Sequence, residues 1–218
     1  MGIRIIRTMN EFIEHMDNIE QDAVETFVAS SFLPSHLFSK STVLRYFKTD
    51  LGNKEAATAA ANALWHRRKH IHMNMNKLPY REIWEINAFE DFCNKGITHR
   101  ENPSFKATPK EIIQVLQNTS LLLAEFPEYE LALCREVLPF VFTVKVGLNL
   151  TIDVRNNFGY QRIQGMVIDD PQIMEEFERE FWRIWKEDTT LFDKEQISAI
   201  LKERIALISD SSHFLIGL

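Results

Sequence analysis

Apolar side chains recur at helical spacing through the first thirty residues of the chain. Phe12, Met16 and Ile19 lie three or four residues apart and follow a T-x-x-E capping box that begins at Thr8. The pattern predicts one amphipathic helix over residues 8–31. We expect this helix to be an association element whose apolar stripe of Phe12, Met16 and Ile19 faces a second copy of the chain.

Further helices are predicted along the chain from the same kind of pattern. They cover "TVLRYF", the alanine-rich "KEAATAAANALWHRRKHIH", "NAFEDFCNKG" with its terminal Gly96, and the segments that follow Thr108-Pro109, Asp170-Pro171 and Asp193. Thr108 is a favourable N-cap because a Pro stands at the first helical position and a Glu three residues after the cap.

After Pro127 the apolar period changes from 3.6 to 2. "YELALC", "PFVFTVKV", "NLTIDV" and "YQRIQGMVI" predict four strands, and the tight "GLN" connection makes the middle two a hairpin. "YREIWEI" alternates in the same way, with Tyr80, Glu82, Trp84 and Ile86 on one side. We therefore expect an α+β fold in which a helical N-terminal half precedes an antiparallel sheet of about 4–5 strands covered by helices, not a Rossmann sheet.

The expected organisation is a helical association element over residues 1–38 and one compact α+β domain over 39–218. The chain has 218 residues, 45% of them hydrophobic and 26% charged, which is ordinary for a soluble globular protein. No apolar run approaches the ~20 residues of a membrane span. Cys93 and Cys134 stand alone in apolar segments, so we expect reduced thiols and a cytoplasmic protein that does not bind membranes.

Charge is distributed unevenly along the chain. The formal net charge of −6 argues against wholesale binding of nucleic acid. Between Glu55 and Glu82 there are five basic residues and no acid, whereas residues 169–195 hold ten acids against four basic residues. We predict that Arg67, Arg68 and Lys69 form an exposed partner surface, and that the acidic segment is its complement within the molecule or across a homodimer.

Histidines near the same basic run have the spacing of metal ligands. His66 and His70 lie one helical turn apart and His72 follows, an arrangement that can chelate a metal. The adjacent Arg67 and Arg68 oppose a cation, so we predict neither a metal nor another cofactor here. No G-x-S-x-G, HExxH, P-loop or G-x-G-x-x-G motif is present, and no catalytic residue is predicted.

Polar and aromatic residues on the predicted sheet suggest a ligand cavity. Glu82 alternates with Arg81, and three more polar side chains flank the "NNFG" loop, while aromatic residues could form the walls. The candidate ligand-binding residues are Arg81, Glu82, Trp84, Phe140, Phe142, Arg155, Tyr160 and Arg162. The alternative is an ordinary solvated sheet face.

From about residue 40 onward the order of these features resembles the effector-like C-terminal domain of Xre-type bacterial transcriptional regulators. The matching pieces are "STVLRYF", "ALWHRRKHIH", "YREIWEINAFEDF", "YELALC", "LPFVFTVK" and "MVIDDPQIMEEFEREFWRIW". The block is roughly 150 residues, the size of one domain. In such regulators the domain follows a helix-turn-helix and senses a small molecule or a partner, whereas this chain has its predicted long helix in that place.

Three hypotheses of function follow. The first is a non-enzymatic regulatory protein that binds a small ligand or a protein partner and forms a homodimer. The second is a DNA-binding transcriptional regulator that uses a divergent helix-turn-helix around residues 41–72. The third is an enzyme with a pocket lined by the sheet, which requires Glu82, Arg155 or Arg162 to converge.

Overall fold

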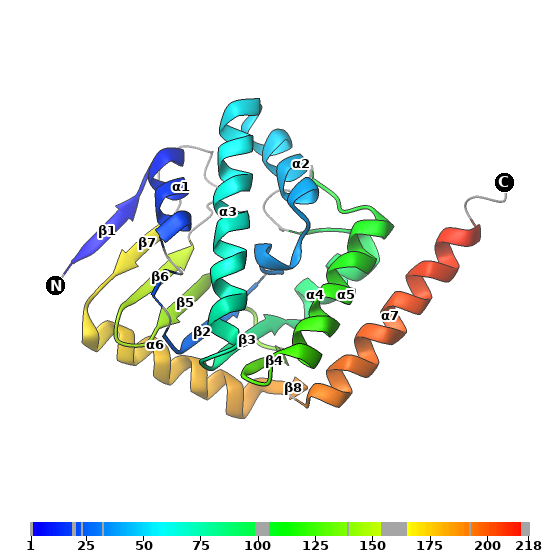
Figure 1. The fold of residues 1–218 in the computed structure, drawn as a ribbon. Helices are drawn as coiled ribbons and strands as arrows, with labels where there is room; N and C mark the ends of the chain where they lie inside the picture. The colour runs from blue at the N-terminus through cyan, green and yellow to red at the C-terminus, as the bar shows by residue number, and fades with distance from the viewer. Residues whose placement is uncertain are drawn as a thin grey trace.

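The computed structural model describes residues 2–18, 21–22, 24–31, 33–98, 105–138, 140–153, 165–191 and 193–214. One mixed sheet runs through the molecule, and helices cover both of its faces (Figure 1). None of the described helices is long and apolar enough to cross a membrane.

Strands and helices alternate along the chain. The elements are β1 (Ile3–Ile6), α1 (Met9–Asn18), β2 (Thr26–Ser30), the 3-10 turn η1 (Ser35–Leu37), α2 (Lys40–Leu51), α3 (Lys54–Met75), β3 (Tyr80–Glu85), α4 (Ile86–Lys95), α5 (Pro109–Glu125), β4 (Tyr129–Cys134), β5 (Val141–Lys145), β6 (Asn149–Asp153), β7 (Gly165–Ile168), α6 (Pro171–Arg183), the π turn η2 (Ile184–Asp188), β8 (Thr189–Leu191) and α7 (Lys194–Phe214).

The strand order among the described residues is β1-β7-β6-β5-β2-β3-β4-β8. The strands β2, β3 and β4 are parallel, with Val28 beside Glu82 and Glu82 beside Leu131. All other neighbouring pairs are antiparallel. The helices α2 and α3 connect β2 to β3, and α4 and α5 connect β3 to β4, as parallel strands require.

The expected fold class is therefore wrong in its architecture. The fold is α+β overall, but its helices and strands are interleaved, and the sheet has eight strands among the described residues, of which β2, β3 and β4 are parallel to one another. The helix expected over residues 8–31 ends at Asn18, and β2 lies in the middle of the sheet. All five residues of β2 are buried because helices cover both faces, so the strand lacks the alternation by which a half-exposed strand is recognised.

Several other sequence-predicted elements are confirmed, whereas residues 160–164 of the predicted strand "YQRIQGMVI" lie outside the described residues and only β7 of it is seen. The alanine-rich segment forms α3, and the segment after Thr108 forms α5 with a complete capping box between Thr108 and Glu111. Helix α4 ends at Gly96, which adopts a left-handed conformation. The expected hairpin joins β5 and β6.

Two hydrophobic cores lie on opposite faces of the sheet. One contains Tyr80 and Trp84 of β3 together with residues of α2, α3 and α5. The other contains Ile83 of the same strand and is covered by α6, which runs along that face (Figure 1). Side chains of β3 therefore alternate between the two cores, and this alternation decides which of them reach the cavity described next.

Candidate ligand cavity

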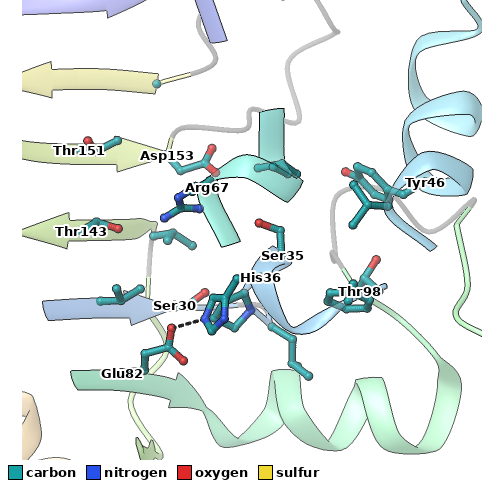
Figure 2. A pocket seen from close by; sticks show the side chains of 18 of the residues that line it. Ser30, Ser35, His36, Tyr46, Arg67, Glu82, Thr98, Thr143, Thr151 and Asp153 are labelled. Atoms are coloured by element: carbon teal, nitrogen blue, oxygen red, sulfur yellow. Dashed lines mark hydrogen bonds and ion pairs between the residues drawn. The ribbon is translucent and has the colours of Figure 1, made fainter. Parts of the chain in front are cut away.

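A cavity of about 110 Å³ lies where β2 ends, between the sheet and the helices α2 and α3 (Figure 2). In open sheets with parallel strands, the carboxyl ends of those strands are the usual place for ligands. Ser30 is the last residue of β2, and Ser35 and His36 of η1 follow it into the cavity wall. Phe38, Val43, Tyr46, Phe47, Tyr80 and Phe105 supply much of the apolar wall.

Glu82 of β3 is the polar centre of this wall and is completely buried. Its Oε1 lies 2.8 Å from Nε2 of His36. Its Oε2 accepts a hydrogen bond from the indole N–H of Trp84 at 3.1 Å and another from the Tyr129 hydroxyl at 2.8 Å. A carboxyl group is tolerated at such depth only because its oxygens are hydrogen-bonded.

The Tyr129 hydroxyl stays protonated in this network. Burial, and after it the charge of Glu82, raise the pKa of Tyr129 well above its ordinary value. The phenol therefore acts as the donor to Glu82, which fixes the carboxyl group against rotation.

His36 presents one ring nitrogen to Glu82, and the other has no partner in the part of the chain that the structure describes. Its side chain is 2% exposed, and among the described residues Nδ1 has no hydrogen-bond partner. Figure 2 shows the imidazole between Glu82 on one side and Ser35, Tyr46 and Thr98 on the other. Thr98 is also buried, and its Oγ1 likewise has no partner within the described part of the chain.

The aromatic end of the cavity is held in place by α2 and α5. The rings of Tyr46 and Phe105 meet edge to face with centroids 5.2 Å apart. The guanidinium group of Arg45 lies 4.3 Å from the centroid of Phe105 and also pairs with Glu111, the residue that completes the α5 capping box. The N-terminus of α5 and this wall are thus one connected structure.

The opposite end of the cavity is polar. Arg67 of α3 and Asp153 at the end of β6 lie there, beside Thr143 and Thr151 (Figure 2). His15 of α1 reaches the same end, with its ring nitrogens 3.2 Å from Arg4 and 3.3 Å from Thr151. Burial, and after it the charges of Arg4, Arg67 and Lys145, lower the pKa of His15 to about 4, so this ring is neutral at neutral pH.

The structure separates the ligand residues that the sequence suggested. Glu82 lines the cavity, and the indole N–H of Trp84 donates a hydrogen bond to Glu82. Arg81 lies on the α6 face, where it pairs with Glu25 and Glu130. Phe140 and Phe142 lie on that face too, with ring centroids 6.0 and 5.2 Å from that of Phe177 in α6. Arg155, Tyr160 and Arg162 lie outside the described residues, as do Ile19 and the side chains of Phe12 and Met16.

Sequence reasoning missed His36, Ser35 and Thr98. The signal for the first two is "LPSHLF", a turn directly after a strand, and it becomes readable only once residues 26–30 are recognised as a parallel strand. Thr98 carries no such signal, because it is marked only by its burial and by a hydroxyl that has no partner among the described residues.

The basic run on α3 divides its side chains between different environments. Arg67 lines the cavity. Arg68 donates to the carbonyl oxygen of Phe38 at 3.0 Å and lies over the ring of Trp65, and burial lowers its pKa. Of the three basic residues proposed as a partner surface, Lys69 is the exposed one.

The neighbouring histidines do not gather into a metal site within the described residues. No group of three or more His, Cys, Asp or Glu side chains there could hold a metal ion. His66 is exposed, whereas the ring of His72 packs against Phe126. Burial is the main reason that the pKa of His72 is lowered to about 4, and the neighbouring His36 and Arg68 lower it further.

Comparison with known proteins gives a distant structural neighbour and no family. No protein-family model and no curated protein matches the chain, so nothing there supports an Xre-type effector domain. One solved structure with a similar arrangement is TrmBL2, an archaeal chromatin protein with a novel mode of DNA binding. The two are 9% identical with a TM-score of 0.46, over 88% of this chain and 54% of that one. The chain thus spans about half the length of TrmBL2, and a similarity of this degree does not extend to a binding site.

Proposed function

We propose that this chain is a regulatory protein that binds a small molecule in the cavity at the end of β2. The observation that carries the proposal is a mostly apolar cavity with a buried polar group, His36 Nδ1, that lacks a partner among the described residues. Small-molecule sites combine largely apolar walls with a few fixed polar groups in this way. A buried polar atom without a partner is unfavourable, and a ligand would relieve that cost.

The geometry supports binding better than catalysis. Glu82 holds His36 in place as the acidic residue beside a catalytic histidine does. Such a histidine activates a nucleophile only when the nucleophile lies within hydrogen-bond reach of it. No Ser, Thr or Cys of the described chain makes a hydrogen bond to His36 Nδ1. The pair is therefore assigned to recognition.

The test is a thermal-shift screen of small molecules against three proteins. Val43 of α2 lines the cavity, so Val43→Phe should fill it, whereas the adjacent and partly buried Leu44 packs elsewhere in the core and Leu44→Phe is the matched control. A ligand at a hundredfold excess over its Kd should raise the Tm of the wild type and of Leu44→Phe by roughly 5 to 10 °C. The same ligand should leave Val43→Phe unchanged. A screen with no stabilising compound, or with equal stabilisation of all three proteins, would contradict the proposal.

Binding of DNA is the second candidate. The segment 41–72 lies in α2 and α3, where the lysines Lys48 and Lys54 are exposed. Retention of a random-sequence DNA duplex at low ionic strength would support this role. In that case Lys48→Gln should reduce the slope of log K against log salt concentration by about one, the amount expected for one lost phosphate contact. An absence of retention would remove it. Homodimer formation stays a prediction that sedimentation can test.

A further inference from the structure

We propose that the outer edge of β1 is an interface at which a second copy of this chain pairs its own β1. One sheet would then continue through both copies, across a twofold axis. The proposal concerns a surface and not the cavity, so its outcome is independent of ligand binding there.

The strand β1 lies at one end of the sheet. It comes first in the strand order, and among the described elements Figure 1 shows β7 on one side of it and none on the other. An edge strand presents a row of backbone N–H and C=O groups that can pair with another strand, and many proteins block such an edge with proline or a bulge. The sequence of β1, IRII, contains no proline, and its register with β7 is regular.

The hydrogen-bond pattern decides which backbone groups of β1 point outward. Gly2 and Asp169 form a hydrogen-bonded pair, because the N–H of Asp169 donates to the carbonyl oxygen of Gly2 at 3.2 Å. Hydrogen-bonded pairs alternate along an antiparallel ladder, so the next residue whose backbone bonds to β7 is Arg4. The N–H and C=O groups of Ile3 and Ile5 therefore point away from the sheet.

The side chains of the same two residues are apolar and lie on the face that α6 covers. Ile3 is 53% exposed and stands opposite Ile168, a buried residue of the core under α6. Ile5 is partly buried and stands opposite Met166, which packs against that core. A second strand along this edge would therefore cover exposed apolar surface and also bond the outward backbone groups.

Two antiparallel registers satisfy the outward groups when β1 pairs with its own copy. A register centred on Arg4 sets two guanidinium groups directly opposite each other, which is unfavourable. A register centred on Ile5 sets this residue against Ile5 of the second copy, and Ile3 against Arg7. Arg4, whose guanidinium group reaches α1, then faces the strand end where the carboxylate of Glu11 accepts from the N–H of Arg7. The charges therefore favour the register centred on Ile5.

The opposite edge of the sheet is a poorer partner for β1. The strand β8 has three residues, and its pairing with β4 contains a register shift. Pairing of β1 with β8 would also generate an open chain of copies, whereas pairing of β1 with itself closes as a dimer. An interface built on one short strand is small, so we expect a dissociation constant in the micromolar range.

Analytical ultracentrifugation of the full chain at micromolar concentrations tests the dimer. Ile3→Lys sets a lysine opposite Arg7 of the second copy, twice in each dimer, so the dissociation constant should rise at least about tenfold. Leu121→Lys is the matched control, because Leu121 is 51% exposed on α5, and it should dimerise like the wild type. A monomeric wild type, or equal weakening by the two substitutions, would overturn the inference.

Crosslinking with oxidised glutathione tests the register. Cα atoms of an antiparallel hydrogen-bonded pair lie about 5.5 Å apart, within the span of a disulfide, so Ile5→Cys should form an intermolecular disulfide. Ile3→Cys should not, because its two copies would lie roughly 14 Å apart along the paired strands. The native Cys93 and Cys134 are buried, and burial raises the pKa of both thiols to about 12, so the wild type should stay uncrosslinked. No crosslink in Ile5→Cys, or an equal one in Ile3→Cys, would overturn the inference.

Discussion

At the scale of the residue, one buried carboxyl group organises the wall of the cavity. Glu82 holds His36, Trp84 and Tyr129 in fixed positions through three hydrogen bonds. A completely buried polar group that loses one of its hydrogen-bond partners costs more free energy than an exposed one does. The network should therefore behave as one unit.

Replacing Tyr129 with Phe tests that unity. We expect Tyr129→Phe to lower the free energy of unfolding by about 1–3 kcal/mol, because Oε2 of Glu82 loses a buried donor. In a Glu82→Gln background the same change should be smaller by about 1 kcal/mol, as urea denaturation of the four proteins would measure. Additive effects of the two substitutions would show that the residues are not coupled.

Two histidines with lowered pKa values, the buried His15 and the half-buried His72, should make stability depend on pH. The pKa values of His15 and His72 fall to about 4 in the folded chain, below the ordinary 6.5. Between these values the unfolded chain binds more protons than the folded one, so stability is full above about pH 6.5 and is lost as pH falls toward 4. The loss for His15 should reach about 3 kcal/mol near pH 4.

The variant His15→Gln should flatten this dependence. Unfolding by urea at several pH values between 7 and 4.5 would measure it, and His72→Gln should act in the same direction. His66→Gln is the control, because His66 is exposed on the same helix as His72. A wild-type slope in His15→Gln would mean that the ring does not titrate as described.

At the scale of the element, a helix boundary could be predicted from the sequence wherever a single residue sets it. Thr108 and Asp170 start helices through their side chains, and Gly96 ends α4 in a left-handed conformation. These boundaries could be predicted because a cap is a local interaction. The strand β2 could not be predicted in this way, because its burial depends on helices that pack on both faces of the sheet. Its apolar residues also fit a helical period.

Two glycines allow a matched test of these boundaries. Both Gly52 and Gly96 have positive φ, but a Cβ at Gly96 would lie 2.3 Å from the carbonyl oxygen of Ala107, whereas no atom of the described residues lies within 4 Å of a Cβ at Gly52. We expect Gly52→Ala to cost about 1 kcal/mol of stability, which reflects conformation alone. Gly96→Ala should cost at least about 2 kcal/mol more, because the segment carrying Ala107 must move. Equal losses in thermal unfolding would contradict this.

At the scale of the whole molecule, the two-sided sheet decides which predicted residues meet. The sequence correctly placed Tyr80, Glu82 and Trp84 on one side of a strand, which is a property of the strand itself. It could not show that Arg81, Phe140 and Phe142 face α6, because that depends on strand order and on which helix covers which face. His36 joins Glu82 across 46 positions of sequence, a contact that no local pattern encodes.

Native mass spectrometry of the freshly purified chain tests the central claim, a small-molecule site in the cavity, most directly. It compares the wild type with the cavity-filled Val43→Phe and the control Leu44→Phe. We predict that the wild type and Leu44→Phe carry a non-covalent adduct, or take up phenol, added as a single-ring probe of the cavity, with one-to-one stoichiometry, and that Val43→Phe does neither. Identical spectra for the three proteins, with or without phenol, would contradict the assignment of the cavity as a ligand site.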